Sequence, residues 1–231
     1  MFERYAVYYT PAPGTALAEF GAAWLGWDSA RGHLVEHLAA VGIDLQKITD
    51  RPRKYGFHGT IKPPFRLANG CEVSALEDAV GRLAANLRSV RLHKGLQLAR
   101  LGRFLALMPA GDVSALNHLA SEVVSKLDHF RAPLTEEEFA RRRSTRLTPQ
   151  QDANLARWGY PFVMDEFRFH LTLTGPLTDA MISDANAALS CALANLSLNS
   201  FDIDALTVLG ERADGRFIQM SRHPLAGTGP L

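Results

Sequence analysis

The sequence predicts a mixed α/β fold of the α+β type, organised as one bilobal domain over residues 1–231. Three observations support this prediction. The strand-like stretch FHGTIKPPF at residues 57–65 recurs as FHLTLTGPL at residues 169–177. The stretch GRFL at residues 102–105 recurs as GRFI at residues 215–218, at nearly the same displacement. Both halves also share the order motif strand, helix, hairpin. Duplication of a lobe within one chain explains all three, and it predicts two pseudo-symmetric lobes of mainly antiparallel sheet with outer helices.

In the first half we expect a strand, a helix, the motif strand, a second helix, a hairpin and a closing helix. Aromatic and β-branched residues predict the first strand, and helical spacing of apolar residues predicts the helix after it, with Trp24 and Trp27 in the core. Ser74 and Glu77 have the spacing of a capping box, which marks a helix start. The expected ranges are 5–10 for the strand, 15–27, 74–87 and 113–130 for the helices, and 95–101 with 104–109 for the hairpin.

Between the halves lies an insertion, residues 133–159, that is predicted to form two short helices joined by a turn at residues 143–147. Thr135 with Glu138, and Thr148 with Gln151, have capping-box spacing, and Gly159 is typical of a helix C-terminus. The insertion is either a surface embellishment or a flap that delivers an arginine to a ligand, and the sequence leaves both open. The second motif strand is followed by a predicted helix at residues 178–196 and a hairpin that turns around residues 214–215.

Composition describes an ordinary globular protein whose charge is local. Hydrophobic residues make up 47% and charged residues 21% of the 231 residues, and the formal net charge is +1. This balance argues against binding of polyanions driven by overall charge. Two runs without acidic residues, 51–71 and 139–151, hold local clusters of lysine and arginine. We find no signal peptide and no apolar run of membrane-spanning length, so we expect a cytoplasmic protein with no membrane partner.

Neither the cysteines nor the closely spaced histidines indicate a metal site. Cys71 and Cys191 lack metal-ligand spacing and imply no disulfide framework. His33 and His37 lie four residues apart in a short helical pattern over residues 33–41, but no third ligand is nearby. We therefore interpret these two histidines as surface residues.

Each motif presents one imidazole and one hydroxyl on the same face of a strand. Residues i and i+2 of a strand share a face. His58 and Thr60 therefore point one way, and His170 and Thr172 do the same in the second copy, while the intervening apolar residues point to the other face.

The two motifs resemble the paired His-x-Thr (HxT) motifs of the two-histidine (2H) phosphoesterase superfamily, which includes RNA 2′,3′-cyclic phosphodiesterases. The wider runs RPRKYGFHGTIKPPF and GYPFVMDEFRFHLTLTGPL resemble one branch of it, associated with bacterial phosphonate utilisation. The resemblance extends over most of the chain. It implies a bilobal fold with a cleft between the lobes and hydrolase chemistry on a phosphate ester that needs neither metal nor cofactor. Gly59 departs from the usual apolar or small residue, and glycine weakens a strand.

Opening a cyclic phosphodiester needs a base to deprotonate water and an acid to protonate the departing alkoxide on the opposite side. Two imidazoles that titrate near neutrality can fill both roles, which makes His58 and His170 the candidate catalytic residues. Thr60 and Thr172 are candidate donors to the non-bridging phosphate oxygens. The sequence does not distinguish the base from the acid.

Further candidates come from strand alternation and from the basic runs. Lys62 lies on the His58 face if the strand continues to Pro63, and Arg168 lies on the His170 face, so both are candidate phosphate-binding residues. Tyr55 has the opposite parity and should point away unless the strand begins later. It is included, with Arg142 and Arg143 of the insertion, as a candidate substrate-binding residue.

Two functions from different classes fit the motifs. The first is a metal-independent cyclic phosphodiesterase that acts on a small phosphorylated sugar or nucleotide, which the branch resemblance connects with phosphonate metabolism. The second is a non-catalytic module that binds nucleotides or RNA ends in the same cleft. Intact histidine and threonine pairs favour the enzyme, because a binding module need not keep an acid–base pair. A metallohydrolase is disfavoured, since no cluster of ligands with metal spacing accompanies the motifs. Hydrolysis versus the reverse ligation, and the oligomeric state, are left open.

Overall fold

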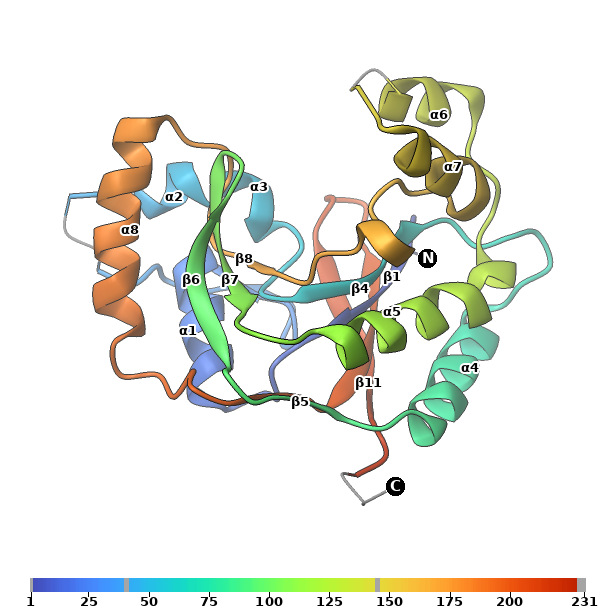
Figure 1. The fold of residues 1–231 in the computed structure, drawn as a ribbon, viewed down its shortest axis with the longest axis horizontal. Helices are drawn as coiled ribbons and strands as arrows, with labels where there is room; N and C mark the ends of the chain where they lie inside the picture. The colour runs from blue at the N-terminus through green and yellow to red at the C-terminus, as the bar shows by residue number, and fades with distance from the viewer. Residues whose placement is uncertain (1, 40–41, 144–145, 228–231) are drawn as a thin grey trace.

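The centre of the molecule is a seven-stranded antiparallel sheet with the strand order β11-β10-β1-β4-β8-β7-β6 (Figure 1). The computed structural model describes residues 2–39, 42–143 and 146–227. The two motif strands, β4 and β8, are neighbours in the middle of the sheet. The strands are β1 (Tyr5–Tyr9), β4 (Gly59–Phe65), β6 (Leu96–Leu101), β7 (Phe104–Pro109), β8 (Leu171–Thr172), β10 (Ala205–Glu211) and β11 (Phe217–Pro224). The predicted α+β class, with a mainly antiparallel sheet and outer helices, is confirmed.

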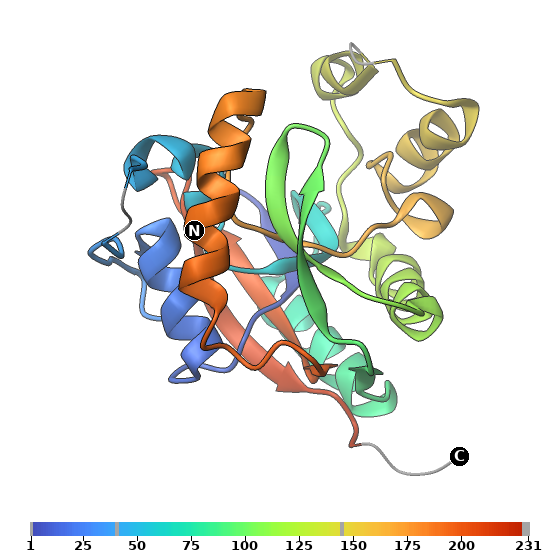
Figure 2. The ribbon, with the colours of Figure 1, turned by 60° about the vertical axis from the view of Figure 1, so that its left-hand side comes forward.

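Each half of the chain completes the part of the sheet that contains the motif strand of the other half. The β6–β7 hairpin comes from the first half but pairs with β8, and the β10–β11 hairpin comes from the second half but joins β4 through β1. Helix α4 (Val73–Asn86) follows β4 and packs on β10 and β11, whereas α8 (Asp179–Leu193) follows β8 and packs on β6 and β7 (Figure 2). The two halves are thus related in arrangement and interlocked in pairing.

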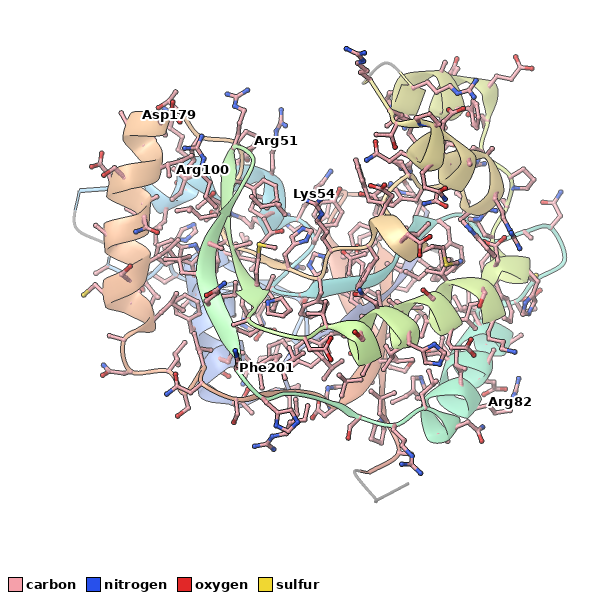
Figure 3. All side chains as sticks on the ribbon, viewed as in Figure 1. Arg51, Lys54, Arg82, Arg100, Asp179 and Phe201 are labelled. Carbon is pink, nitrogen blue, oxygen red and sulfur yellow. The ribbon has the colours of Figure 1, made fainter. Side chains whose placement is uncertain are left out.

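Further contacts join the two halves of the chain. Strands β5 (Val90–Leu92) and β9 (Phe201–Ile203), which precede the two hairpins, pair with one another. An ion pair between Arg100 on β6 and Asp179 at the start of α8, with a nitrogen–oxygen distance of 2.7 Å, ties the first hairpin to the second-half helix (Figure 3).

The two faces of the sheet differ. Residues of α1 (Ala16–Leu25), α4, α5 (Ser114–Lys126) and α8 join the main hydrophobic core on one face. Strand β1 shows the alternation, because Val7 belongs to that core whereas Tyr8 belongs to a small cluster on the opposite face with Ala6, Leu209 and Phe217. The second face therefore carries few apolar residues and is the face on which the histidines lie.

Both tryptophans predicted to be core residues are buried, and each satisfies its indole N–H. Trp24 Nε1 donates to the carbonyl of Leu173 at 2.8 Å, and Trp27 Nε1 donates to the carbonyl of Phe217 at 2.9 Å. Each bond connects the N-terminal region to the second half of the chain, which adds to the interlocking of the halves.

The insertion forms the predicted pair of helices, α6 (Glu136–Arg143) and α7 (Pro149–Trp158), which project beyond one end of the sheet (Figure 1). Thr148 and Gln151 make both bonds of a capping box, and Gly159 caps α7 with a left-handed φ of 72°. Thr135 and Glu138 cap α6 in the same way. Residues 144–145 of the predicted turn lie outside the described part of the chain.

Local predictions were wrong in two places. Residues 33–39 contain no helix. Instead Gly32, with a φ of 71°, turns the chain so that β3 (His33–Leu34) pairs with β2 (Trp27–Asp28), and residues 40–41 are outside the described ranges. Helix α4 begins at Val73 rather than after Ser74, and its N-cap, Glu72, makes no side-chain capping bond. Two short helices, α2 (Leu45–Ile48) and α3 (Asp50–Arg53), precede the first motif.

No helix within the described ranges is long and apolar enough to span a bilayer.

Candidate active site

The pairing of β4 with β8 brings the two His-x-Thr motifs together. In each motif the residue between histidine and threonine is the one that pairs with the other strand. Antiparallel geometry then sets His58 opposite Thr172 and Thr60 opposite His170, with all four side chains on the same face. The structure therefore gathers the predicted histidines and threonines around the centre of the sheet.

Both imidazoles are held in the same way by the backbone two residues earlier. His58 Nδ1 lies 2.9 Å from the carbonyl oxygen of Gly56, and His170 Nδ1 lies 2.7 Å from that of Arg168. A carbonyl can only accept, so Nδ1 carries the proton in each ring and Nε2 keeps a lone pair. His58 Nε2 lies 3.2 Å from Thr60 Oγ1. The free nitrogen of this ring is therefore directed to the hydroxyl of its own motif.

Burial makes both histidines weaker bases than a free imidazole. It lowers the pKa of His58 to about 4, although the bond to Gly56 opposes the shift, and the charge of His170 lowers it further. Burial also lowers the pKa of His170, with the Arg168 carbonyl opposing. The effect of His170 on the pKa of His58 shows that the rings lie within electrostatic range. Tyr8 stacks on His58 with ring centroids 3.9 Å apart, which fixes the imidazole plane.

Glycine allows the close approach between the motif strands. A Cβ on Gly59 would lie 2.3 Å from the ring of Phe169, so this ring lies directly over the first motif strand. Phe57, the corresponding residue of the first motif, lies over Gly21 of α1 in the same way, at 2.2 Å from a Cβ built there. The departure of Gly59 from the motif pattern is therefore a packing requirement of the β4–β8 pair.

A cavity of about 430 Å³ opens beside His170 and Thr60. Its walls come from β4, from the β6–β7 hairpin and from the segment that joins α7 to β8, and most of them are apolar or aromatic. Phe104 approaches the imidazole of His170, with ring centroids 5.7 Å apart. One polar pair stands in this wall, where Gln151 Nε2 donates to Glu166 Oε2 at 2.8 Å. The space fits an organic group of moderate size next to the histidines.

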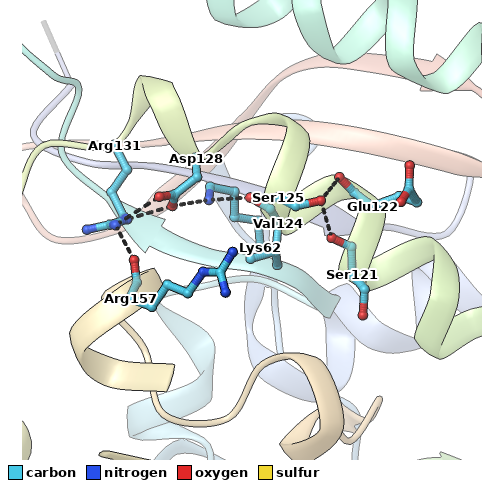
Figure 4. A network of polar contacts seen from close by, with 8 residues as sticks. All are labelled: Lys62, Ser121, Glu122, Val124, Ser125, Asp128, Arg131 and Arg157. Carbon is cyan, nitrogen blue, oxygen red and sulfur yellow. Dashed lines mark hydrogen bonds and ion pairs between the residues drawn. The ribbon is translucent and has the colours of Figure 1, made fainter. Parts of the chain in front are cut away.

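Lys62 does not lie on the His58 face as predicted. Register shifts in the β1–β4 pair insert an extra residue after Thr60, so Lys62 pairs with Val7 and shares its face. The ammonium is buried against α5, where it donates to the carbonyl of Val124 at 3.1 Å and to Asp128 at 3.3 Å (Figure 4). Burial lowers the pKa of Lys62 to about 8. Its role as a phosphate ligand is therefore withdrawn.

For Tyr55 the stated exception applies, since β4 begins only at Gly59 and Gly56 turns the chain with a φ of 71°. Tyr55 lies on the His58 side, with ring centroids 6.0 Å apart, and packs on Phe217. Arg168 is exposed and lines the cavity together with His170, as its position before the second motif predicted.

The two arginines of the insertion differ. Arg143 donates through two nitrogens to Asp152 of α7 and lies over the ring of Phe139, so it joins α6 to α7. Arg142 is partly buried and lies over the ring of Tyr160, with its Cζ 5.2 Å from the centroid. Tyr160 lines the cavity. Of the two candidates, only Arg142 adjoins the site.

Strand alternation placed Glu166 on the His170 face, but the sequence did not identify Tyr8, Tyr160, Phe104 and Arg4 as neighbours of the site. Tyr8 could have been found, because it lies in a predicted strand, but its partner strand was not predictable. Within the described ranges, no group of three or more His, Cys, Asp and Glu side chains has the spacing of a metal site.

Comparison with known proteins adds a family. Two bacterial proteins named "Ribose 1,5-bisphosphate phosphokinase PhnN" are similar to the chain. That of Janthinobacterium sp. (strain Marseille) is 36% identical over 98% of this chain and 51% of its own length, and that of Laribacter hongkongensis (strain HLHK9) is 32% identical over 78% of this chain and 42% of its own length. The chain thus spans about half the length of these relatives, or less.

A solved structure described as "Crystal structure of phosphoesterase" aligns over 98% of this chain and 99% of its own, with 16% identity and a TM-score of 0.43. The sequence profile of the family described as "Protein of unknown function (DUF1045)" matches residues 60–218, which is more than half of the sequence and includes the second motif and, of the first, the part from Thr60 onward. The chain therefore belongs to the DUF1045 family.

Proposed function

We propose that this chain is a metal-independent phosphoesterase that hydrolyses a cyclic phosphodiester of a small phosphorylated sugar or nucleotide. The observation that carries the proposal is the pair of imidazoles on one face of the β4–β8 pair, each with its Nδ1–H bonded to a backbone carbonyl. That arrangement leaves two Nε2 atoms to exchange protons with a ligand, and it sets a threonine hydroxyl opposite each ring.

The pKa shifts support an assignment of roles. His58, with the pKa lowered to about 4, is neutral at pH 7 and is the base that takes a proton from water. The water oxygen forms a bond to phosphorus, the ring P–O bond breaks, and His170 donates a proton to the departing alkoxide. A phosphate anion bound between the rings raises both pKa values, which charges His170 for this role. Thr60 and Thr172 donate to the non-bridging oxygens, and the product is a phosphate monoester.

The cavity beside His170 is where the organic part of the substrate would lie. Aromatic walls from Phe104 and Phe162 suit the face of a sugar or a base, and the Gln151–Glu166 pair offers hydrogen bonds to hydroxyl or amino groups. Arg168 at the rim is the candidate phosphate ligand that retains its predicted place.

The names of the relatives bear on the substrate. They describe a kinase of ribose 1,5-bisphosphate, a phosphorylated pentose, while this chain spans about half of their length. A Walker A loop requires Gly-Lys, and this sequence contains no Gly-Lys dipeptide. We therefore do not propose kinase activity for this chain. The name only suggests a pentose phosphate as the first substrate to test, in line with phosphonate metabolism. A cytoplasmic site of action remains part of the proposal.

The test is an activity screen of chelator-treated protein against cyclic phosphates of ribose and of nucleosides. His58→Ala and His170→Ala should each lower kcat by about 10²–10⁴-fold while affinity changes little, because each removes one proton transfer. His118→Ala, at an exposed position on α5, is the matched control and should keep full activity. The kcat/KM should be highest below pH 6.5, where His58 is neutral and His170 still binds a proton.

The alternative, a non-catalytic module for nucleotides or RNA ends, predicts binding of these ligands without turnover. If the protein bound these ligands but formed no product from any of the cyclic phosphates, the non-catalytic module would be the better description. Activity that chelators abolish and zinc or manganese restores would overturn the two-histidine mechanism.

A further inference from the structure

The cavity beside His170 contains a carboxylate that the proposed proton transfers do not use. Glu166 is partly buried and lines the cavity, and within the described ranges it forms no ion pair. The bond that its Oε2 accepts from Gln151 Nε2, at 2.8 Å, uses one of roughly four acceptor positions of an ionised carboxylate. Arg168 lines the same cavity without pairing with Glu166. Most of the acceptor capacity of Glu166 is therefore open to a ligand.

Helix α7 of the insertion fixes the position of this carboxylate. Gln151 Oε1 accepts from the backbone N–H of Thr148 at 3.1 Å, as part of the capping box, so the amide turns its Nε2 to Glu166. Asn154 of the same helix is buried and donates to the carbonyl of Val163 at 2.9 Å. The helix thus holds both the carboxylate and the chain that leads to it, and the insertion helps to shape the cavity.

The turn that carries Glu166 is strained. Met164, at the start of the 3₁₀ turn Met164–Glu166, has a φ of 54° and is the only non-glycine residue with a positive φ in the part of the chain that the structure describes. This left-handed conformation is unfavourable for a residue with a side chain. Strain of this kind collects at functional sites, where the surrounding structure enforces it. Its presence in the cavity wall supports a functional role for Glu166.

The aromatic walls suit a planar ring. Phe104, Tyr160 and Phe162 line the cavity, and the rings of Tyr160 and Phe162 lie 5.8 Å apart between centroids. Phe162 is 47% exposed, which is unusual for so large an apolar side chain and leaves its face open to a ligand. A pentose ring alone would fill only part of the 430 Å³. A flat, uncharged ring with N–H donors on one edge matches both the walls and the carboxylate, whereas Glu166 would repel a second anionic group.

Among the common bases, guanine matches a carboxylate best. Guanine presents N1–H and its 2-amino group side by side, and these two donors can meet the two oxygens of one carboxylate. Hypoxanthine presents N1–H without the amino group, and adenine has an acceptor at N1. Glu166 precedes His170 by four residues, at most about 14 Å of chain, so one mononucleotide can contact both.

We infer that Glu166 is a specificity-determining residue and that it selects guanine as the base of the substrate. This inference rests on the proposed function, in which the cyclic phosphate lies between His58 and His170. The base lies against the aromatic walls with its N1 and 2-amino edge on Glu166, and Gln151 holds that carboxylate in place. The substrate class narrows to a cyclic phosphodiester of guanosine.

The test compares the 2′,3′-cyclic phosphates of guanosine, inosine, adenosine and uridine with ribose 1,2-cyclic phosphate, which has no base. The full-length protein should prefer the guanosine compound over the inosine compound, which lacks only the amino group, by about tenfold in kcat/KM. Glu166→Gln removes the charge but keeps the size of the side chain. It should lower kcat/KM for the guanosine compound about 10- to 100-fold, mainly through KM, and should change hydrolysis of the ribose compound little.

Asp165→Asn is the matched control, because this exposed carboxylate is adjacent in sequence but does not line the cavity. It should keep the preference for guanosine. Equal kcat/KM for guanosine and inosine, preference for another base or for the ribose compound, or an equal loss in Asp165→Asn would overturn the guanine site while leaving the phosphoesterase intact.

If none of the five compounds is hydrolysed, the proposed function fails instead. Calorimetry of the same compounds then decides about the guanine site. Tighter binding of the guanosine compound than of the inosine compound, lost in Glu166→Gln, supports the site, and equal binding refutes it.

Discussion

At the scale of single residues, the two motif histidines differ in how far burial moves them. His58 lies under the ring of Tyr8 and has a pKa lowered to about 4, whereas His170 lies at the mouth of the cavity. The same His-x-Thr pattern therefore produces two different acid–base groups. The difference comes from the surroundings: Tyr8 of β1 stacks on the first ring with centroids 3.9 Å apart, whereas Phe104 of β7 lies tilted to the second ring, 5.7 Å away.

This difference predicts a pH dependence of stability. The folded-state pKa of His58 is below that of an unfolded histidine, near 6.5, so the unfolded state binds more protons between pH 6.5 and about 4. The free energy of unfolding should therefore fall as the pH decreases through this window, by about 2 kcal/mol from His58 after allowance for its partial exposure. Urea unfolding of the protein and of His58→Gln at pH 7, 5.5 and 4.5 measures it.

In that experiment the variant should lose less stability on acidification than the parent protein. Carboxylates contribute equally to both curves and cancel in the difference. Parallel curves for the two proteins would show that His58 is not buried in its neutral form.

Strand alternation located the four motif side chains from the sequence but not the basic residue that follows them. Lys62 lies only two residues beyond Thr60, yet the register shift in β4 moves it to the opposite face, where Asp128 and Arg131 form an ion-pair cluster (Figure 4). The position of a β-bulge depends on the partner strand and on the following prolines. Pro63 and Pro64 do not indicate which residue of β4 forms the bulge. Parity arguments therefore hold only up to the first irregularity of a strand.

At the scale of elements, the β4–β8 contact depends on one missing side chain. Gly59→Ala should reduce stability by about 1–3 kcal/mol and should also lower activity, since the added Cβ would lie 2.3 Å from the Phe169 ring and separate the motif strands. Thermal unfolding and kcat on the best cyclic phosphate measure the two effects.

The second variant of this test is Gly59→Ala with Phe169→Leu, in which the smaller side chain should recover part of both losses. Gly227→Ala is the control, because a Cβ there meets nothing within 4 Å. A fully stable and active Gly59→Ala would mean that the strands do not need this close approach.

Most elements could be predicted because their signals are local. Capping residues fixed both helices of the insertion, and Gly102–Arg103 fixed the first hairpin, to within a residue or two of the observed bounds. The strands and helices missed are β2, β3, β5, β9, α2 and α3. Each is at most four residues long, which is too short for a periodic pattern of apolar residues to be recognised. Tyr8, Arg4 and Tyr160 were missed for another reason: they join the site only through pairings and packing distant in sequence.

At the scale of the whole molecule, the halves should not fold separately. Strand β1 pairs with β10 on one side and β4 on the other, and β8 pairs with β7, so neither half contains its own complete part of the sheet. The intact protein should unfold in a single cooperative transition, whereas fragments 1–132 and 133–231 should each lack stable structure. Circular dichroism and amide exchange on the intact chain, on each fragment and on their mixture measure it.

The mixture is the informative control, since recovery of structure only on mixing would confirm the interlocked pairing. A fragment that folds by itself would contradict it and would indicate two independent lobes.

The strand order also determines how long β1 waits for its partner strand during synthesis. Strand β1, YAVYY, is synthesised about 200 residues before its partner β10 is complete, since β10 ends at residue 211 and β11 at residue 224. At about 5–20 residues per second, the edge of β1 stays open for roughly 10–40 s. The strand contains no charge and no proline, and such edges recruit other chains. A chain cut short before β10 would therefore yield an aggregating product in place of a smaller folded one, so β10 and β11 together protect the edge of β1.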